Sequence, residues 1–378
     1  MKRTATTCGA MLAALTLGAC GGASSEIPMA DSGGPTGDLP VANANCEGTG
    51  DVEFICNVPS PEDLVAIPGT PFVVASGYAG GAIHYVSTRD LSRVQVFPID
   101  NPTLAHDTDN FGSCPGPIDS GEGEQFSAHG LNIRRIEDGR YLLYVVHHGF
   151  RESIEFFEID TRTQGGESGT TVPGFAWVGC VIAPEFVTLN SVSPLPGGGF
   201  VATVVYMPPE LTNAEPAGGD RYGVVWEWSP TDGWSIVAGS ESPGPNGIEA
   251  SRDGRWLYVN LWASSQVMRL SRGQTPVEKE VFELSFHPDN VHWQADGSLF
   301  TAGHNAATFA RTQGCLTTFC EDMSSHVARI DPDTMTIEEI VNFPASEFFY
   351  TSTSALQVED EIWIGSMRGD RIARYATR

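Results

Sequence analysis

The chain has 378 residues, with 47 acidic and 21 basic side chains and a formal net charge of −26. This excess of negative charge argues against nucleic acid or an anionic membrane surface as the main partner, because both are themselves anionic. The 42 glycines and 25 prolines are spread along the chain as turn residues, which is typical of many short strands and favours an all-β fold.

The N-terminus has the pattern of a secretion signal. Lys2 and Arg3 precede a short apolar run that ends in Leu17-Gly18-Ala19-Cys20, a sequence similar to the bacterial lipobox. We therefore expect a signal peptide over residues 1–19 and a lipidated Cys20, which would make the chain an exported lipoprotein of the bacterial cell envelope. Its only membrane contact would be the lipid anchor, and an ordinary signal cleaved nearby is the alternative. Residues 20–45 have the Gly-, Ser-, Ala- and Pro-rich composition of a flexible tether.

Six cysteines follow the lipobox, and an even number in an exported protein favours disulfides. Cys46 with Cys56 and Cys315 with Cys320 are close enough in sequence for local pairs, which leaves Cys114 with Cys180. No CxxC pair occurs, so a zinc or redox site is disfavoured.

Six segments share one pattern, in which a polar residue begins a short apolar strand, a glycine-containing turn follows, and a second apolar strand returns. The segments start at Glu62, His129, Asn190, Asn246, Asp289 and Ser352. Their spacing of roughly 45 to 65 residues is near the blade length of a β-propeller. The pattern predicts a six-bladed β-propeller over residues 46–378, with packed β-sandwiches as the alternative.

The second of these segments contains three histidines. If its turn has four residues, Ile136 pairs with Tyr141, and counting outward places His129 directly opposite His148. A one-residue slip of this register would exchange the facing of His147 and His148.

In a propeller the innermost strands surround the central channel, so the starting residues of all six segments converge on one end of the axis. This convergence brings together five side chains with hard oxygen atoms: Glu62, Asn190, Asn246, Asp289 and Asn290. Oxygen ligands with two formal negative charges suit calcium, which takes about six to eight of them including waters. The ion would be catalytic, or purely structural as the alternative.

The histidine pair lies at the same end of the axis. His129 would remove a proton from water, and His148 would hydrogen-bond to His129 and fix its tautomer. Together with a Lewis-acidic ion, the pair predicts hydrolysis of an ester or lactone. His304 ends a strand of the fifth segment, is expected opposite Asp289, and would form a wall of the substrate site. No GxSxG, HExxH, Walker or dinucleotide-binding motif occurs, which leaves little support for a covalent serine mechanism.

At these positions the chain resembles the paraoxonase/arylesterase family of calcium-dependent six-bladed propellers, and more distantly the gluconolactonase and strictosidine-synthase-like propellers. The matching motifs span roughly residues 60 to 375 and include "EDLVAIPGTPFVVASG", "LNSVSPLPGGGF", "NGIEASRDGRWLYV" and "DNVHWQADGSLFTAGH". The resemblance implies that the five oxygen residues hold a catalytic calcium, that His129 is the general base with His148 as its partner, and that His304 lines the active-site wall.

Three departures from the family pattern affect what can be carried over. Ser191 replaces an acid that helps to bind a second, buried calcium, so only Asp63 and the Leu131 carbonyl remain for such a structural ion. No cysteine follows Cys320, so the propeller would close by strand pairing instead of by the family's terminal disulfide. The segment 101–124 is longer and richer in Gly and Pro, which points to a different substrate pocket.

The sequence therefore predicts a calcium-dependent hydrolase of lactones, aryl esters or both, with a small-molecule substrate. Two alternatives stay open: a non-catalytic, calcium-stabilised propeller used for binding or scaffolding, and a propeller enzyme acting on sugar lactones. A sugar lactonase would need fewer metal ligands and no histidine pair.

Overall fold

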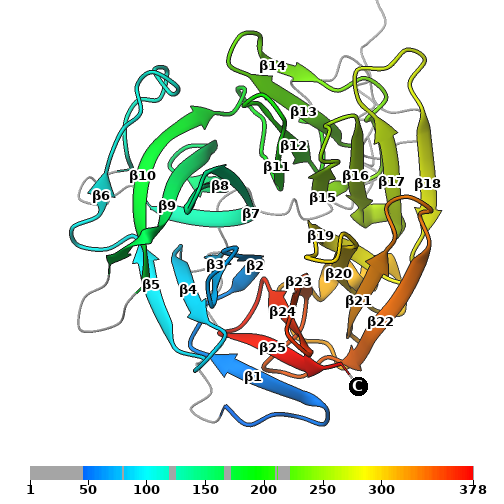
Figure 1. Ribbon diagram of the computed structural model, residues 1–378. Coiled ribbons are helices and arrows are strands. Elements are labelled where there is room, and N and C mark those ends of the chain that lie inside the picture. The colour runs from blue at the N-terminus through cyan, green and yellow to red at the C-terminus, as the bar shows by residue number, and fades with distance from the viewer. Residues whose placement is uncertain are drawn as a thin grey trace, which may run out of the picture. The chain divides into compact units, whose positions relative to one another are not determined.

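The computed structural model of the chain describes residues 46–78, 81–118, 125–165, 172–208, 211 and 222–377. Within these residues the strands form six sheets, antiparallel apart from one short strand, which are arranged as the blades of a propeller (Figure 1). The predicted six-bladed β-propeller is thereby confirmed. The predicted signal peptide, lipidated Cys20 and tether lie outside the described residues.

The strands of each blade follow one another from the axis outward. Blade 1 contains β2 (Pro61–Ala66), β3 (Phe72–Gly77), β4 (Ile83–Ser87) and β5 (Arg93–Phe97). Blade 2 contains β7 (Phe126–Glu137), β8 (Arg140–Gly149), β9 (Ser153–Gly165), β10 (Val172–Ile182) and the short parallel β6 (Thr103–Leu104). Blade 3 contains β11 (Val192–Pro194), β12 (Phe200–Val204), β13 (Val224–Ser229) and β14 (Gly233–Ile236).

Blade 4 contains β15 (Pro245–Ala250), β16 (Trp256–Leu261), β17 (Gln266–Ser271) and β18 (Lys279–Glu283). Blade 5 contains β19 (His287–Trp293), β20 (Leu299–Asn305), β21 (Ser324–Ile330) and β22 (Ile337–Pro344). Blade 6 contains β23 (Ser352–Val358), β24 (Glu361–Ser366), β25 (Arg371–Ala376) and, as its outer strand, β1 (Val52–Cys56). Two short helical elements, η3 (Trp262–Ser264) and α1 (Phe309–Gly314), follow second strands.

The propeller closes where the N-terminal strand β1 pairs antiparallel with β25, and Figure 1 shows these blue and red strands side by side. The register runs from Val52 opposite Tyr375 to Cys56 opposite Arg371, so closure rests on strand pairing, as the sequence predicts. The Cys46–Cys56 disulfide ties the segment before β1 to its last residue. The other two predicted disulfides, Cys114–Cys180 and Cys315–Cys320, are also formed.

The core lies between the blades, where the faces of neighbouring sheets pack together. Large aromatic side chains such as Tyr85, Phe157 and Trp177 are almost fully buried there, in keeping with the aromatic-rich strands. Neighbouring inner strands contact each other all the way round, from β2 to β7, β11, β15, β19, β23 and back to β2. This ring of inner strands places side chains from all six blades around one axis. No helix in the described part of the chain is both long and apolar enough to cross a membrane.

Candidate functional site

The inner strands share an irregularity at the end where the polar starting residues lie. In five of them the pairing with the second strand skips two residues, as a β-bulge does. The skipped pairs are Glu62–Asp63, His129–Gly130, Asn246–Gly247, Asp289–Asn290 and Thr353–Ser354. A bulge turns side chains out of the strand's normal alternation, so these bulges direct polar residues toward the axis.

Side chains of the second strands hold the bulges in place. The Ser76 hydroxyl accepts a hydrogen bond from the Asp63 amide at 2.9 Å. Thr203 accepts from the Ser191 amide at 3.1 Å and donates to the Asn246 carbonyl. These bonds satisfy main-chain groups that the skipped pairing leaves without a ladder partner.

Two bulge glycines allow neighbouring blades to approach closely. A Cβ atom on Gly130 would lie 2.6 Å from the Asn190 carbonyl oxygen, and one on Gly247 would lie 2.4 Å from the Asp289 carbonyl oxygen. Such distances are too short for any side chain, so glycine is required for the inner strands to meet.

We call the polar residues at this end of the axis the upper axial layer: Glu62, Asn190, Asn246, Asp289 and Asn290. Asn190 is partly buried and the others are buried, and several of their side chains interact. The Asn290 amide nitrogen donates to Glu62 Oε1 at 2.6 Å, and the Asn246 side chain hydrogen-bonds to Asp289. Burial and the neighbouring carboxylates of Asp63 and Asp289 raise the pKa of Glu62 well above its ordinary value. Burial raises the pKa of Asp289 to about 8; the Asn246 hydrogen bond opposes this shift, and the charge of Asp63 adds a smaller raising effect.

Several oxygens of this layer fit a hard cation. Glu62 Oε2, Asn190 Oδ1 and Asn246 Oδ1 are buried and have no hydrogen-bond partner among the described residues. A buried oxygen without a donor is costly, and two carboxylates in one buried cluster repel each other. A calcium ion bound to these oxygens would remove both penalties, and carboxylate and amide oxygens are its preferred ligands.

The histidine pair lies next to this layer. His129 Nδ1 is 2.7 Å from His148 Nε2, while His129 Nε2 is 3.7 Å from Glu62 Oε1. The predicted contact is therefore present, but the predicted register is wrong. His148 pairs with Ser127 and Tyr141 pairs with Arg135, because bulges at Ala128/Leu131 and Arg135/Glu137 shift the count. His129 lies in the bulge and not directly opposite His148, and its ring still reaches His148.

The other histidine of the segment has a structural environment. His147 donates from Nδ1 to the Arg151 carbonyl at 2.8 Å, and burial lowers its pKa to about 3. Burial, with a contribution from His148, also lowers the pKa of His129 well below its ordinary value. The lowered pKa keeps the His129 ring neutral, so one of its two nitrogens has a free lone pair.

Glu152 is a partner of the pair that sequence reasoning missed. Both of its carboxylate oxygens lie 3.0 Å from His148 Nδ1. Glu152 belongs to the turn between β8 and β9, where an acidic residue is unremarkable. Its only sequence signal is its position four residues after His148.

A second group of polar residues, the lower axial layer, consists of Asp63, Asn132, Ser193, Glu249 and His292. His292 joins the two carboxylates: Nε2 lies 2.7 Å from Asp63 Oδ1 and Nδ1 lies 3.2 Å from Glu249 Oε1. Burial disfavours its charged form, yet the Asp63 and Glu249 carboxylates raise the pKa of His292 to about 10. Asn132 and Ser193 donate to the two Glu249 oxygens at 3.1 and 3.0 Å.

This layer does not fit the second calcium that Asp63 and the Leu131 carbonyl were expected to bind. The two Asp63 oxygens already accept hydrogen bonds, Oδ1 from His292 and Oδ2 from the Leu131 amide at 2.7 Å. A protonated His292 already supplies positive charge between the Asp63 and Glu249 carboxylates.

His304 is buried, but not opposite Asp289 as predicted. The bulge between Pro288 and Val291 shifts the register so that His304 faces His287. The Trp262 indole donates to His304 Nε2 at 3.3 Å, and His304 Nδ1 donates to the Ser352 carbonyl at 3.0 Å. Burial lowers the pKa of His304 to about 4. With both nitrogens engaged and no exposed surface, His304 supports the Trp262 ring.

No protein-family model and no curated protein matches the chain. Solved propellers share its fold. A putative gluconolactonase is 14% identical, with a TM-score of 0.50 over 90% of this chain and 94% of its own. Regucalcin from Agrobacterium tumefaciens, described as calcium-binding, is 12% identical with a TM-score of 0.48 over 85% and 92%. A streptogramin B lyase is 11% identical with a TM-score of 0.48 over 85% and 96%. At such identities the likeness establishes the fold alone.

Proposed function

We propose that the protein is a calcium-dependent hydrolase of lactones, aryl esters or both. The observation that carries the proposal is the position of His129 Nε2. It lies 3.7 Å from Glu62, beside a layer that contains three buried oxygens without partners. A neutral imidazole next to a cation site is an arrangement that suits metal-assisted hydrolysis.

The upper axial layer supplies the residues that would hold the ion: Glu62, Asn190, Asn246, Asp289 and Asn290. When bound, calcium supplies Lewis acidity that polarises a carbonyl and stabilises an oxyanion.

We propose that side chains of this protein remove the proton from the attacking water. In this proposal His129 takes a proton from water through Nε2, the nitrogen that lies 3.7 Å from Glu62 Oε1. The hydrogen bond to His148 holds the ring in place, and the Tyr78 ring packs on His129 with centroids 4.6 Å apart, which limits access of bulk water.

The substrate class comes from the sequence motifs. Their resemblance to the paraoxonase/arylesterase family favours lactones and aryl esters, and the paired histidines favour these over sugar lactones. The described part of the segment 101–124, residues 101–118, is joined to blade 2 by the disulfide between Cys114 and Cys180 of β10, and we propose that this segment helps to set the preference among substrates.

The decisive experiment measures hydrolysis of a panel of lactones and aryl esters by the purified protein, with bound calcium quantified, before and after treatment with a chelator. We expect calcium-dependent hydrolysis that returns when calcium is added back. Activity that survives complete removal of calcium would contradict the metal mechanism. Bound calcium without turnover of any substrate would favour the scaffold function, and turnover of sugar lactones alone would favour the sugar-lactonase alternative.

We further propose that the chain is exported and anchored through Cys20. The three disulfides of the propeller suit an oxidising compartment outside the cytosol. Metabolic labelling with an alkyne fatty acid in a bacterial host should mark the wild-type protein and not the Cys20→Ser variant. Equal labelling of the two proteins would disprove lipidation at Cys20.

A further inference from the structure

We propose that Glu152 is a positioning residue that fixes the proton arrangement of both imidazoles and completes a relay, Glu152–His148–His129. The inference rests on the proposed hydrolase function and adds to it a residue that does not touch the reacting atoms. It follows from the hydrogen bonds on both sides of His148.

The order of donors and acceptors in this relay is determined from its outer end. A carboxylate of Glu152 only accepts, so His148 must carry its proton on Nδ1, 3.0 Å from both carboxylate oxygens. His148 Nε2 then has a lone pair and accepts from His129 Nδ1 at 2.7 Å. His129 Nε2 is consequently unprotonated and faces Glu62, 3.7 Å away. Glu152 thus makes the nitrogen next to the cation site the basic one.

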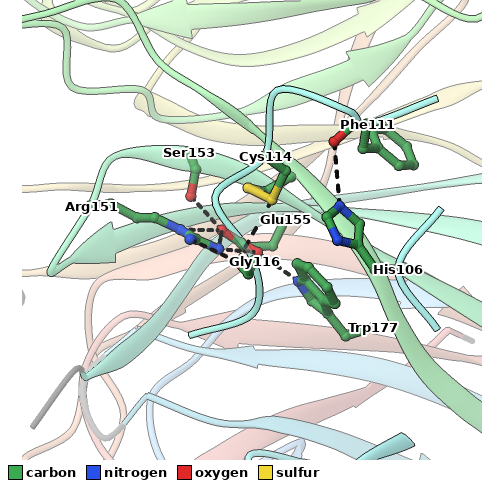
Figure 2. Close-up of a disulfide and its surroundings, with 9 residues drawn as sticks. His106, Phe111, Cys114, Gly116, Arg151, Ser153, Glu155 and Trp177 are labelled. Atoms are coloured by element: carbon green, nitrogen blue, oxygen red, sulfur yellow. Dashed lines mark hydrogen bonds and ion pairs between the residues drawn. A yellow bond between two sulfur atoms is a disulfide. The ribbon is translucent and has the colours of Figure 1, made fainter. Parts of the chain in front are cut away.

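The turn that carries Glu152 is held firmly by the side chain of Arg151. Figure 2 shows the Arg151 guanidinium directed at Glu155, with Ser153 and Trp177 gathered around the same carboxylate. Arg151 Nε and Nη2 donate to the two Glu155 oxygens at 2.9 and 3.0 Å, and the Trp177 indole donates to Glu155 at 2.7 Å. Arg151 and Glu155 are almost fully buried, and such a two-pronged ion pair restricts the turn strongly.

The insertion before β7 adds a second support to this turn. Arg151 Nη1 donates to the Gly116 carbonyl at 2.9 Å, and Cys114, two residues earlier, is joined to Cys180 of β10 (Figure 2). On the main chain, the Ala183 amide donates to the Glu152 carbonyl at 3.0 Å. The Glu152 carboxylate is therefore presented to His148 from a fixed backbone.

The Glu152→Gln variant tests the inference, because glutamine keeps the shape of the side chain and removes its charge. A glutamine can also turn its amide nitrogen toward His148, which would favour the opposite tautomer along the relay. We expect kcat on a lactone or aryl ester to fall about 10- to 100-fold, since a correctly arranged base contributes about 100-fold or more. KM, bound calcium and thermal stability should stay close to those of the wild type.

A spectroscopic measurement separates positioning from a merely structural role. In full-length protein labelled with ¹⁵N-histidine, His148 should give the Nδ1–H tautomer in the wild type and a mixed or reversed tautomer in Glu152→Gln. Glu152→Asp, which keeps the charge, should recover part of the lost kcat. Glu185→Gln, an exposed carboxylate in the loop after β10, is the matched control and should leave kcat and the spectrum unchanged.

Unchanged kcat together with an unchanged His148 spectrum in Glu152→Gln would overturn the relay while leaving the proposed function intact. If the wild type hydrolyses no substrate of the panel, the proposed function fails, and the tautomer measurement still decides whether Glu152 orders the two rings. A fall in kcat that occurs only with loss of thermal stability or of calcium would assign Glu152 a structural role and also overturn the inference.

Discussion

The upper and lower axial layers contain the same number of carboxylates, two each, and solve the same electrostatic problem in different ways. In the lower layer Asp63 and Glu249 share His292, and each of their carboxylate oxygens has a donor. In the upper layer Glu62 and Asp289 have raised pKa values, and oxygens of Glu62, Asn190 and Asn246 have no partner. In the lower layer the protonated His292 side chain provides the positive charge, whereas the upper layer has buried oxygens that a bound cation would satisfy.

The difference teaches where stability and function lie along the axis. In the lower layer, side chains and a main-chain amide from different blades supply the hydrogen-bond donors that the carboxylates require. Such a layer joins the blades without a bound ion. A layer with unsatisfied oxygens gains stability only with a ligand, which makes it the better candidate for a reactive site. Substitutions that change one layer at a time can test this division.

The largest effect is expected from Asp289→Asn in the upper layer. Removing one of its two carboxylates should weaken calcium binding more than about 100-fold, because even the outer partners of a metal site contribute about 10- to 100-fold. Turnover should disappear with the metal. Calorimetric titration with calcium and an activity assay check this result, with Asp333→Asn as a control at an exposed carboxylate. Wild-type calcium affinity in Asp289→Asn would remove this residue from the site.

A smaller effect on activity is expected from His129→Gln, which leaves the upper layer's oxygens unchanged. Loss of a general base typically lowers kcat by about 100- to 10,000-fold. Calcium binding and the melting temperature should stay near wild-type values. A fully active His129→Gln variant would show that another group is the base.

In the lower layer, His292→Gln should affect stability more than catalysis. The substitution leaves two buried carboxylates without a cation, and breaking such a buried arrangement costs about 3 to 5 kcal/mol. Denaturant unfolding in saturating calcium measures the loss, and kcat should change by less than the loss caused by His129→Gln. A variant as stable as the wild type would mean that the lower layer does not depend on the His292 charge.

The smallest expected effect is on the pH dependence of stability. It concerns the difference in unfolding free energy between the wild type and His292→Gln. The pKa of His292 is raised from 6.5 to about 10 in the folded protein, so its protonated form is favoured by folding. The stability that His292 contributes through this shift is fully present below pH 6.5 and is lost as the pH rises through 10. The difference in unfolding free energy should therefore shrink from neutral to alkaline pH. A difference that grows over this range would contradict the assigned charge.

The fold could be predicted from the sequence because each blade has its own local pattern. Alternating apolar residues and a polar starting residue recur six times, with a glycine-containing turn in five of the six hairpins, and the inner strands begin near those starting residues. The three disulfide pairs are those that spacing makes plausible, but the sequence by itself leaves other connectivities open.

The contacts within the axial layers could not be predicted in the same way. His304 was expected opposite Asp289, and His129 opposite His148, because counting along a hairpin assumes unbroken pairing. The bulges break that pairing, and they depend on hydroxyl groups of other strands such as Ser76 and Thr203. His292 looks like an ordinary strand residue in the sequence. Only its place three residues after Asp289, like Glu249 after Asn246, indicates a second layer.

By itself the sequence determined that six similar hairpins form and which polar residues begin them, because side-chain alternation and turn chemistry act over a few neighbouring residues. The tertiary structure alone decided which of those residues meet, through bulges, close glycine contacts and hydrogen bonds between blades. Glu62 and Asn290 are separated by 228 residues, yet their side chains lie 2.6 Å apart. Only closure of the ring of inner strands brings such pairs together.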